Sequence, residues 1–192
     1  MKKLLLLLCF VFIHQVVYPV YFKHLGMSDG LSQVSVMSIY QDCLGRMWFG
    51  TREGVSIYDG ERMRVYKGWE NLDPESSINV LLGHECDHLT GNRQGDIFFR
   101  TCDSLVRYDI REEKFCVVSG CKAKTITSAD GDIWTGYDDM VCRYDEKGDS
   151  LQLYAKTNTP GISSLLISGK KIWIGTYAVS YTHLRAHETG AY

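Results

Sequence analysis

Residues 45–60 read GRMWFGTREGVSIYDG, and this stretch decides how the rest of the chain is interpreted. Met47–Thr51 is a run of apolar and aromatic residues of the kind that favours β-strands. The turn Arg52-Glu53-Gly54 follows, and Gly54 is free to adopt a positive φ. Val55–Tyr58 forms the returning strand, and Asp59-Gly60 signals a second turn. The stretch therefore predicts two short antiparallel strands joined by a tight turn.

The same pattern recurs along the chain. Each of the first three copies places a Tyr-Asp pair at one fixed distance after an aromatic residue, and a fourth copy supplies only the aromatic. The aromatic residues are Trp48, Phe98, Trp134 and Trp173, and the pairs begin at Tyr58, Tyr108 and Tyr144. A glycine precedes each aromatic residue, at a common position for Gly45, Gly95 and Gly131 and one residue away for Gly169. The sequence is therefore an internal repeat.

Each repeat unit contains four short strand signals separated by turns. In the first unit they are residues 34–40, 47–51, 55–58 and 62–66. In the second they are residues 78–82, 97–101, 105–108 and 114–118, with a long connection over residues 83–94. Repeats of about 40 residues with four strands are typical of propeller blades. The predicted fold is all-β, a partial β-propeller over residues 20–177 with about three and a half four-stranded blades. The blades are residues 22–66, 76–118, 121–154 and 161–177.

The repeated aromatic residues are predicted to lie between blades. A four-stranded blade has two apolar faces, which neighbouring blades must cover. The alternative is that these aromatic residues line a ligand pocket. A position that repeats in every blade favours core packing, because a binding site has no reason to repeat.

Composition excludes several functional classes. The chain has 192 residues, a formal net charge of -2 and 45% hydrophobic residues. The chain has no excess of basic residues, so its composition does not indicate nucleic acid as a partner. Many aromatic residues and only 3 prolines suit a β-rich protein.

Residues 1–19 are predicted to be a signal peptide. Lys2-Lys3 precedes the apolar run Leu4–Ile13, which is too short to span a bilayer, since a span needs about 20 residues. An uncleaved membrane anchor is the alternative. Export bears on the six cysteines that follow, because an oxidising compartment permits disulfides. We expect small core thiols, and the nearest pairs for any bridge are Cys86–Cys102 and Cys116–Cys121.

The last residues, 178–192, do not continue the repeat. Their sequence resembles one reading frame of a transposon-derived sequencing adapter, so we predict an artefact and a natural chain that continues beyond residue 178. His183 and His187 have the spacing of a metal-binding pair on a helix. We set that interpretation aside, because the segment is not expected to be biological.

The motif Gly-x-hydrophobic-Trp-x-Gly-Thr-x-x-Gly-Val, closing on Tyr-Asp, resembles the two-component regulator propeller repeat. The stretch from Phe22 to Gln33 looks like the mature N-terminus of such sensors in gut Bacteroidetes. The second unit departs from the motif: Arg100 replaces the glycine of Gly50-Thr51, and Asp103-Ser104 replaces the Glu-Gly of the turn. The third unit lacks the turn glycine.

The resemblance implies the N-terminal part of a periplasmic sensor in a hybrid two-component histidine kinase. Such sensors typically detect oligosaccharides released from glycans, act as homodimers and are anchored in the inner membrane by a helix further along the chain. The fragment itself is then not an enzyme, and no cofactor is expected. The alternatives are an exported propeller enzyme, such as a lyase or glycosidase, and a scaffold.

Three groups of residues carry other chemistry, and each has a structural interpretation that we prefer. His84, Cys86 and His88 occupy alternate positions, as zinc ligands on one face of a strand would. The interpretation that we prefer is an exposed loop of polar residues. Four acidic residues could include a pair of carboxylates for glycoside hydrolysis. We prefer to interpret them as turn residues, since acidic side chains favour turns. They are Glu85, Asp87, Asp96 and Asp103. Asp130-Gly131-Asp132 and Asp138-Asp139 suggest calcium, but the twelve-residue loop with its closing Glu is missing. We assign no catalytic, metal or cofactor residue, and the ligand-binding residues remain unassigned.

Overall fold

The computed structural model describes residues 21–67, 81, 85–102, 104–120 and 122–177, and the backbone of residues 182–185. The predicted signal peptide and most of residues 178–192 lie outside the described residues. The described chain is almost entirely β-structure, with one short 3-10 helix, η1 (Met27–Asp29). Among these residues, no helix has the length and hydropathy needed to cross a membrane.

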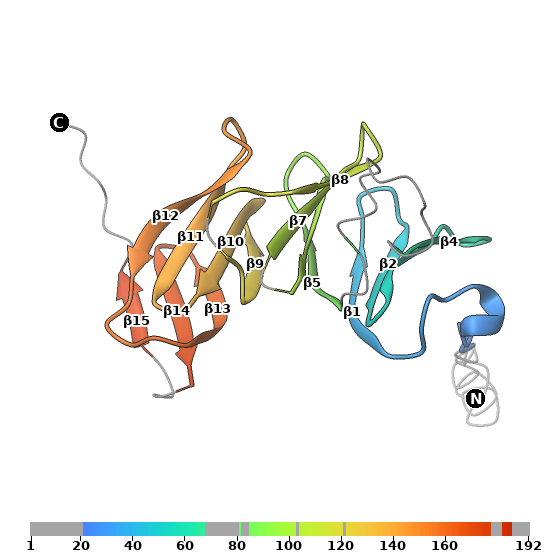
Figure 1. The fold of residues 1–192 in the computed structure, drawn as a ribbon, viewed down its shortest axis with the longest axis horizontal. Coiled ribbons are helices and arrows are strands. Elements are labelled where there is room, and N and C mark those ends of the chain that lie inside the picture. Colours follow the sequence, from blue (N-terminus) through green and yellow to red (C-terminus); the bar gives the residue numbers. More distant parts are fainter. Residues whose placement is uncertain are drawn as a thin grey trace, which may run out of the picture.

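The strands form four antiparallel sheets in which each strand pairs with the next in sequence (Figure 1). Sheet 1 consists of β1 (Val36–Gln41), β2 (Met47–Thr51), β3 (Gly54–Tyr58) and β4 (Met63–Tyr66). Sheet 2 consists of β5 (Cys86–Gly91), β6 (Ile97–Thr101), β7 (Ser104–Asp109) and β8 (Lys114–Val117). Sheet 3 consists of β9 (Thr125–Ala129), β10 (Asp132–Tyr137), β11 (Met140–Asp145) and β12 (Ser150–Lys156). Sheet 4 consists of β13 (Ile162–Ser168), β14 (Lys171–Thr176) and β15 (Thr182–Arg185).

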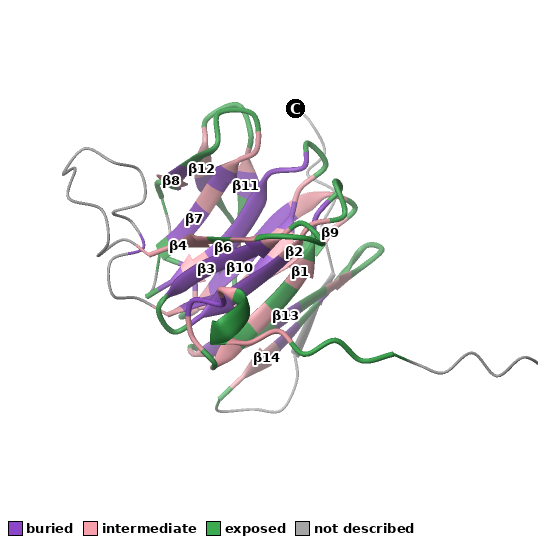
Figure 2. Cartoon of the chain, turned by 90° about the vertical axis from the view of Figure 1, so that its right-hand side faces the viewer, coloured by how far each residue is buried: buried purple, intermediate pink, exposed green. Residues whose placement is uncertain are grey.

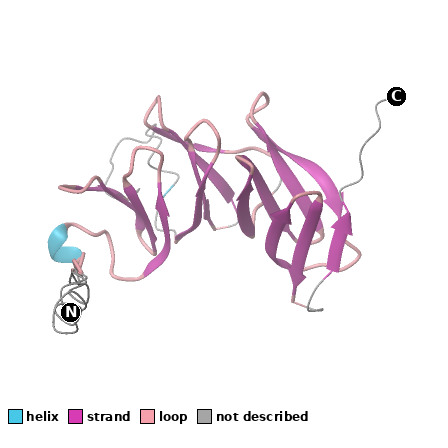
Figure 3. Ribbon diagram, turned by 180° about the vertical axis from the view of Figure 1, so that it is seen from behind, coloured by secondary structure: helices cyan, strands magenta, loops and turns pink. Residues whose placement is uncertain are grey.

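The four sheets stand side by side as blades of a propeller. The first strands of consecutive sheets contact one another, β1 with β5, β5 with β9 and β9 with β13, so these strands form the inner edge. The fourth strands lie at the outer edge, and the sheets fan out between the two edges (Figures 1 and 3). The prediction of an all-β partial propeller is therefore confirmed.

Predicted and observed strands agree closely in sheet 1 and over the last three strands of sheet 2, but not at the start of sheet 2. The first strand of sheet 2 was expected at residues 78–82 and lies instead at Cys86–Gly91, so that prediction was wrong. Of residues 78–82 only Leu81 is described, and its side chain is buried in the core. The sequence of β5, CDHLTG, hides the strand because a bulge between Asp87 and Thr90 interrupts the alternation of its side chains.

The backbone of β15 pairs with β14, although its sequence belongs to the segment predicted to be an artefact. An exposed strand edge accepts any extended chain, because the pairing uses only backbone groups. The origin of residues 178–192 therefore stays a prediction.

The repeated Asp of the Tyr-Asp pair caps the turn between the third and fourth strands. Asp59 Oδ1 accepts hydrogen bonds from the amides of Glu61 and Arg62 at 2.9 and 2.8 Å. Asp109 Oδ1 likewise accepts hydrogen bonds from the amides of Arg111 and Glu112 at 2.9 and 3.0 Å. A short acidic side chain that satisfies turn amides explains why this position repeats.

Three hydrophobic clusters fill the spaces between the four sheets. Trp48, Phe98 and Trp134 each lie in the cluster between their own sheet and the next, which confirms them as core residues. Buried residues follow the middle strands, and exposed residues gather in the turns (Figure 2). Trp173 differs: it is 40% exposed, because its neighbours Ile172 and Ile174 face sheet 3 and it points to the opposite face.

Candidate functional site

Sheet 2 departs from the repeat at its inner strands. Sheets 1 and 3 have Gly50 and Gly136 at the position where sheet 2 has Arg100. A Cβ atom on Gly50 would lie 2.4 Å from the carbonyl oxygen of Cys86, and one on Gly136 would lie 2.6 Å from Ile162 Cγ2. The first strand of the next sheet therefore passes directly over these glycines. In sheet 2 the strands β6 and β9 contact each other less, which leaves room for a large side chain.

Arg100 forms a bidentate ion pair with Asp87, which lies opposite it in the register of β5 and β6. Arg100 Nε donates to Asp87 Oδ1 at 2.8 Å, and Nη2 donates to Oδ2. The third nitrogen, Nη1, donates to the carbonyl oxygen of Cys102 at 2.8 Å. His88 Nδ1 lies 2.9 Å from Asp87 Oδ1. The Arg100 and Asp87 side chains are only 15% and 10% exposed, so this is a largely buried charged cluster.

Asp87 is held in its ionised form. Burial raises the pKa of its carboxyl, but the adjacent His88 and the hydrogen bonds from Arg100 outweigh burial and lower that pKa below its ordinary value. A buried ion pair contributes little net stability, because desolvation of both charges offsets their attraction. Sheets 1 and 3 pack without such a pair, so packing alone does not require the charges in sheet 2.

The cluster lies at the inner edge of the molecule, since β5 runs between β1 and β9 (Figure 1). At the start of β5, Glu85 faces Arg52 of sheet 1 at 4.0 Å. Both of these side chains are exposed, at 41% and 63%. We define Arg52, Glu85, Asp87, His88 and Arg100 as the inner-edge cluster. It is the candidate functional site, because these charges do not repeat from sheet to sheet.

The zinc interpretation of the segment 84–88 finds no support in the described residues. Cys86 is buried, and burial raises the pKa of its thiol to about 12, so the thiolate that zinc requires is disfavoured. The backbone of His88 has a φ of 53°, which breaks the alternation needed for one shared face. No group of three potential ligands lies together in the described part of the chain, and His84 lies outside it. The preferred loop was also wrong, since Cys86–Gly91 is a strand.

Each of the three described carboxylates that were considered for hydrolysis lies beside an arginine. Glu85 faces Arg52 and Asp87 binds Arg100, as described above. Asp96 accepts from Arg107 Nη1 at 3.2 Å, and Asp103 lies outside the described residues. A glycosidase needs one carboxyl group that is free to donate a proton, and Asp87, whose pKa is lowered, does not suit that role.

The acidic residues considered for calcium lie at opposite ends of sheet 3. Asp130 and Asp132 flank the turn between β9 and β10, and Asp132 binds Arg143 at 2.7 Å. Asp138 and Asp139 form the turn between β10 and β11, where Asp138 has a φ of 53°. Asp130, Asp138 and Asp139 are turn residues and Asp132 begins β10, and the fold does not bring the two groups together.

The cysteines are present as thiols at the described positions. Cys86 and Cys142 are buried in the core clusters, as predicted, whereas Cys43 and Cys102 are exposed. Cys121 lies outside the described residues, so the pair Cys116–Cys121 is not seen.

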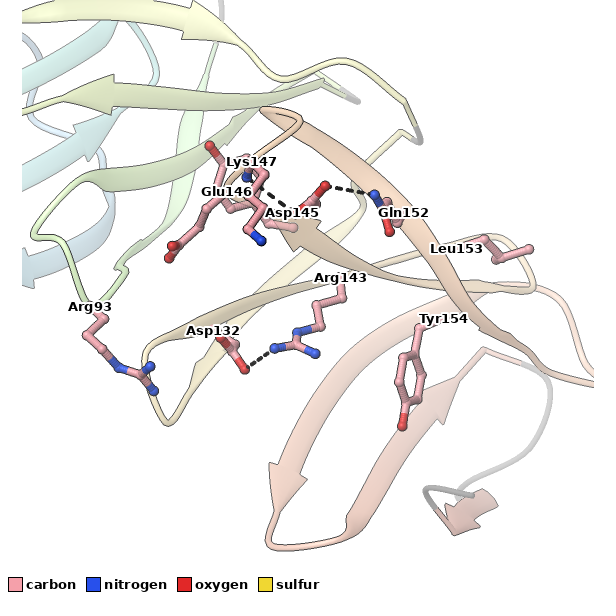
Figure 4. Close-up of a pocket in the computed structure, with 10 residues that line it drawn as sticks. Arg93, Asp132, Arg143, Asp145, Glu146, Lys147, Gln152, Leu153 and Tyr154 are labelled. Atoms are coloured by element: carbon pink, nitrogen blue, oxygen red, sulfur yellow. Dashed lines mark hydrogen bonds and ion pairs between the residues drawn. The ribbon is translucent and has the colours of Figure 1, made fainter. Parts of the chain in front are cut away.

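Two polar clefts lie at the other end of the sheets, and the sequence did not indicate them. The larger, about 370 Å³, lies on sheet 3, where Arg143 meets Asp132 and Gln152 meets Asp145 (Figure 4). The smaller, about 270 Å³, lies between sheets 2 and 3 beside Arg107. Arg107 binds three carboxylates, those of Asp96, Asp109 and Asp149. Only the three-dimensional arrangement of turns from different repeats creates these clefts.

No protein-family model matches the chain. A curated relative, Histidine kinase P4 of Formosa agariphila, is 41% identical over 59 residues, which are 31% of this chain and 4% of the relative. The extracellular domain of the hybrid two-component system BT3049 from B. thetaiotaomicron matches with a TM-score of 0.72 at 23% identity, over 85% of this chain and 25% of that one. The extracellular domain of BT4673 from the same organism matches with a TM-score of 0.61 at 18% identity, over 81% and 22%.

The chain thus spans about a quarter of these extracellular domains and a small part of the histidine kinase. The two structures share its arrangement of four-stranded sheets, and the kinase shares part of its sequence. The chain therefore has the propeller fold of the extracellular domains of hybrid two-component systems, as its repeat motif predicted.

Proposed function

We propose that this chain is the N-terminal part of the ligand-sensing domain of an exported hybrid two-component histidine kinase. Its fold and its sequence relative support a sensing role. In this proposal the domain lies in the periplasm, the complete protein is a homodimer anchored by a membrane helix further along the chain, and ligand binding shifts the population of kinase states. The ligand class is oligosaccharides derived from glycans.

The observation that carries the binding part of the proposal is the inner-edge cluster. The glycines and aromatic residues that recur from sheet to sheet serve packing. The charged group of Asp87, His88 and Arg100, in contrast, is found in sheet 2 and does not recur in the other sheets. Charged side chains beside an inner edge are suited to hydrogen bonding with sugar hydroxyl groups.

Binding is tested with the chain itself and defined oligosaccharides prepared by enzymatic digestion of plant and host polysaccharides. Titration calorimetry of the chain with each oligosaccharide should find one class that binds. Arg52→Gln should weaken that binding by about tenfold, the effect of one charge-assisted hydrogen bond. Arg62→Gln, an exposed arginine at the opposite end of sheet 1, should leave affinity unchanged. Equal losses for the two variants, or no binding by any class, would overturn the assignment of the inner edge.

The signalling part is tested independently by sequencing the source DNA across codon 178. We expect the reading frame to continue into further repeats, a membrane helix and kinase motifs. A stop codon directly behind residue 192 would overturn the sensor assignment and leave a short exported binding protein.

A further inference from the structure

The inner strand of sheet 2 carries a β-bulge that lies at a different place from the bulges of sheets 1 and 4. In those two sheets the strand register shifts directly after the first residue of the inner strand, Val36 in β1 and Ile162 in β13. In sheet 2 the second residue, Asp87, is still paired with Arg100, and the register shifts only after it. The displaced bulge therefore keeps Asp87 opposite Arg100 and re-aims the residue that follows.

That residue is His88, and its backbone is left-handed, with a φ of 53°. A side chain with a β-carbon is strained in this conformation, which persists only where the surrounding structure supports it. Sheet 1 supplies a support: the backbone amide of Leu89, inside the bulge, donates to Ser38 Oγ on β1 at 2.9 Å. A side chain of the neighbouring sheet thus holds the conformation of the bulge.

The bulge turns one edge of the His88 ring toward Asp87 and leaves the ring accessible elsewhere. Nδ1 is buried and lies 2.9 Å from Asp87 Oδ1, whereas the His88 side chain as a whole is 35% exposed. The other ring nitrogen, Nε2, is not buried and makes no hydrogen bond within the described part of the chain. The Asp87 and Arg100 side chains are only 10% and 15% exposed. His88 is therefore the most accessible polar group of the three.

The ionised carboxylate of Asp87 decides where the neutral ring carries its hydrogen. A carboxylate oxygen at 2.9 Å attracts an N–H group and repels a nitrogen lone pair, so Nδ1 carries the hydrogen. Nε2 then presents a lone pair to the surroundings. An accessible acceptor of this kind is suited to a sugar hydroxyl group, which can donate a hydrogen bond to it.

We infer that His88 Nε2 accepts a hydrogen bond from a hydroxyl group of the bound saccharide, and that Ser38 is a positioning residue for this contact. Ser38 holds the bulge of β5 in the conformation that presents the nitrogen. The binding site is then built from two sheets, because sheet 1 fixes the backbone and sheet 2 supplies the contact. This inference rests on the proposed function, in which the inner-edge cluster binds oligosaccharides.

The contact is tested by proton–nitrogen correlation spectra of the histidine rings in the labelled chain. The probes are unfractionated enzymatic digests of plant cell-wall and mucin polysaccharides. A digest that binds should shift the Nε2 resonance of His88 more than its Nδ1 resonance. His88→Asn identifies these signals by their loss; asparagine tolerates the left-handed backbone and keeps an N–H group near Asp87, but it lacks Nε2. Calorimetry should find that His88→Asn weakens binding about tenfold.

The positioning role of Ser38 is tested with a rescue variant and a matched control. Ser38→Ala should weaken binding about fivefold and speed hydrogen exchange of the Leu89 amide, whereas Ser38→Thr retains the hydroxyl group and should retain both properties. Ser128→Ala is the control, because Ser128 Oγ donates to the carbonyl oxygen of Gly91 at the other end of β5, at 3.0 Å. It should leave affinity unchanged.

The outcomes separate this inference from the proposed function. Unchanged affinity in His88→Asn, with binding still weakened by Arg52→Gln, would overturn the contact and leave saccharide binding at the inner edge in place. Equal losses for Ser38→Ala and Ser128→Ala would overturn the positioning role of Ser38. If no digest binds the parent chain, the proposed function fails, and the inference fails with it.

Discussion

At the scale of single residues, one carboxylate, that of Asp42, holds together the first turn of the repeat. Asp42 is 5% exposed and accepts hydrogen bonds from Trp48 Nε1 at 2.8 Å and Arg46 Nε at 2.6 Å. It also accepts from the backbone amides of Leu44 and Arg46. Burial raises the pKa of Asp42, but these hydrogen bonds outweigh burial and lower it.

We expect Asp42→Ala to lower the free energy of unfolding by about 3 kcal/mol, since several buried donors lose a charged acceptor. Because the folded-state pKa is lowered, this stability is present above the unfolded pKa and is lost as pH falls through the folded one. Urea unfolding at pH 7 and pH 3 should therefore show a smaller cost of the substitution at pH 3. Glu61→Ala, at an exposed turn position, is the control and should shift the midpoint little; a cost for Asp42→Ala that is independent of pH would contradict this.

A second prediction at the scale of single residues concerns the ion pair between Arg100 and Asp87. Arg100→Gly restores the repeat residue but leaves Asp87 buried without its guanidinium partner, at a cost of about 3–5 kcal/mol. Without Arg100 the pKa of Asp87 should rise, so the cost of Arg100→Gly should be largest near pH 7 and should shrink as the pH falls and protonation neutralises the buried carboxyl group. Adding Asp87→Asn removes the buried charge and should recover most of the loss. If the double variant is no more stable than Arg100→Gly alone, the charge is not the cause.

At the scale of elements, a pair of packed aromatic residues joins each sheet to the next. Phe98 is fully buried, and its ring meets that of Tyr144, whose hydroxyl group donates to Asp149 at 2.6 Å. Phe98→Leu and Tyr144→Leu, combined in a double-mutant cycle, should reveal a coupling of about 1 kcal/mol. Phe98 with Tyr108 is the matched control, because those residues lie in different clusters. Chemical denaturation measures all variants, and equal coupling in both cycles would show that the pair is not specific.

How far the elements follow from sequence depends on how regularly the repeat is kept. Strands such as β2 and β10 were predictable because an aromatic residue, a glycine and a turn signal occur in fixed order. β5 was not, since Asp87 and His88 interrupt the apolar alternation, and Arg100, the arginine partner of Asp87, lies across the sheet. The candidate site is hidden for the same reason: Arg100 was visible as a departure from the motif, but nothing local placed it opposite Asp87.

At the scale of the whole molecule, the stack of sheets ends in two apolar faces. Sheet 4 exposes Leu166 and Trp173, which lie opposite each other in the register, at 59% and 40%. Sheet 1 exposes Met37 and Ile39 at 42% and 58%. Faces built to pack against another blade promote association when water covers them. We therefore expect the isolated chain to self-associate through these end faces.

Replacing the apolar pair on sheet 4 should test this directly. The double variant Leu166→Lys, Trp173→Lys removes the apolar contact and adds like charges, which should weaken association by at least tenfold, or about 1.4 kcal/mol. Val117→Lys changes a residue that is 55% exposed on the outer edge of sheet 2 and should leave association unchanged. Sedimentation velocity over a range of concentrations measures each chain. Because the outer edge and the end face are similarly exposed, equal weakening by both variants would mean that added charge, rather than a specific blade face, controls assembly.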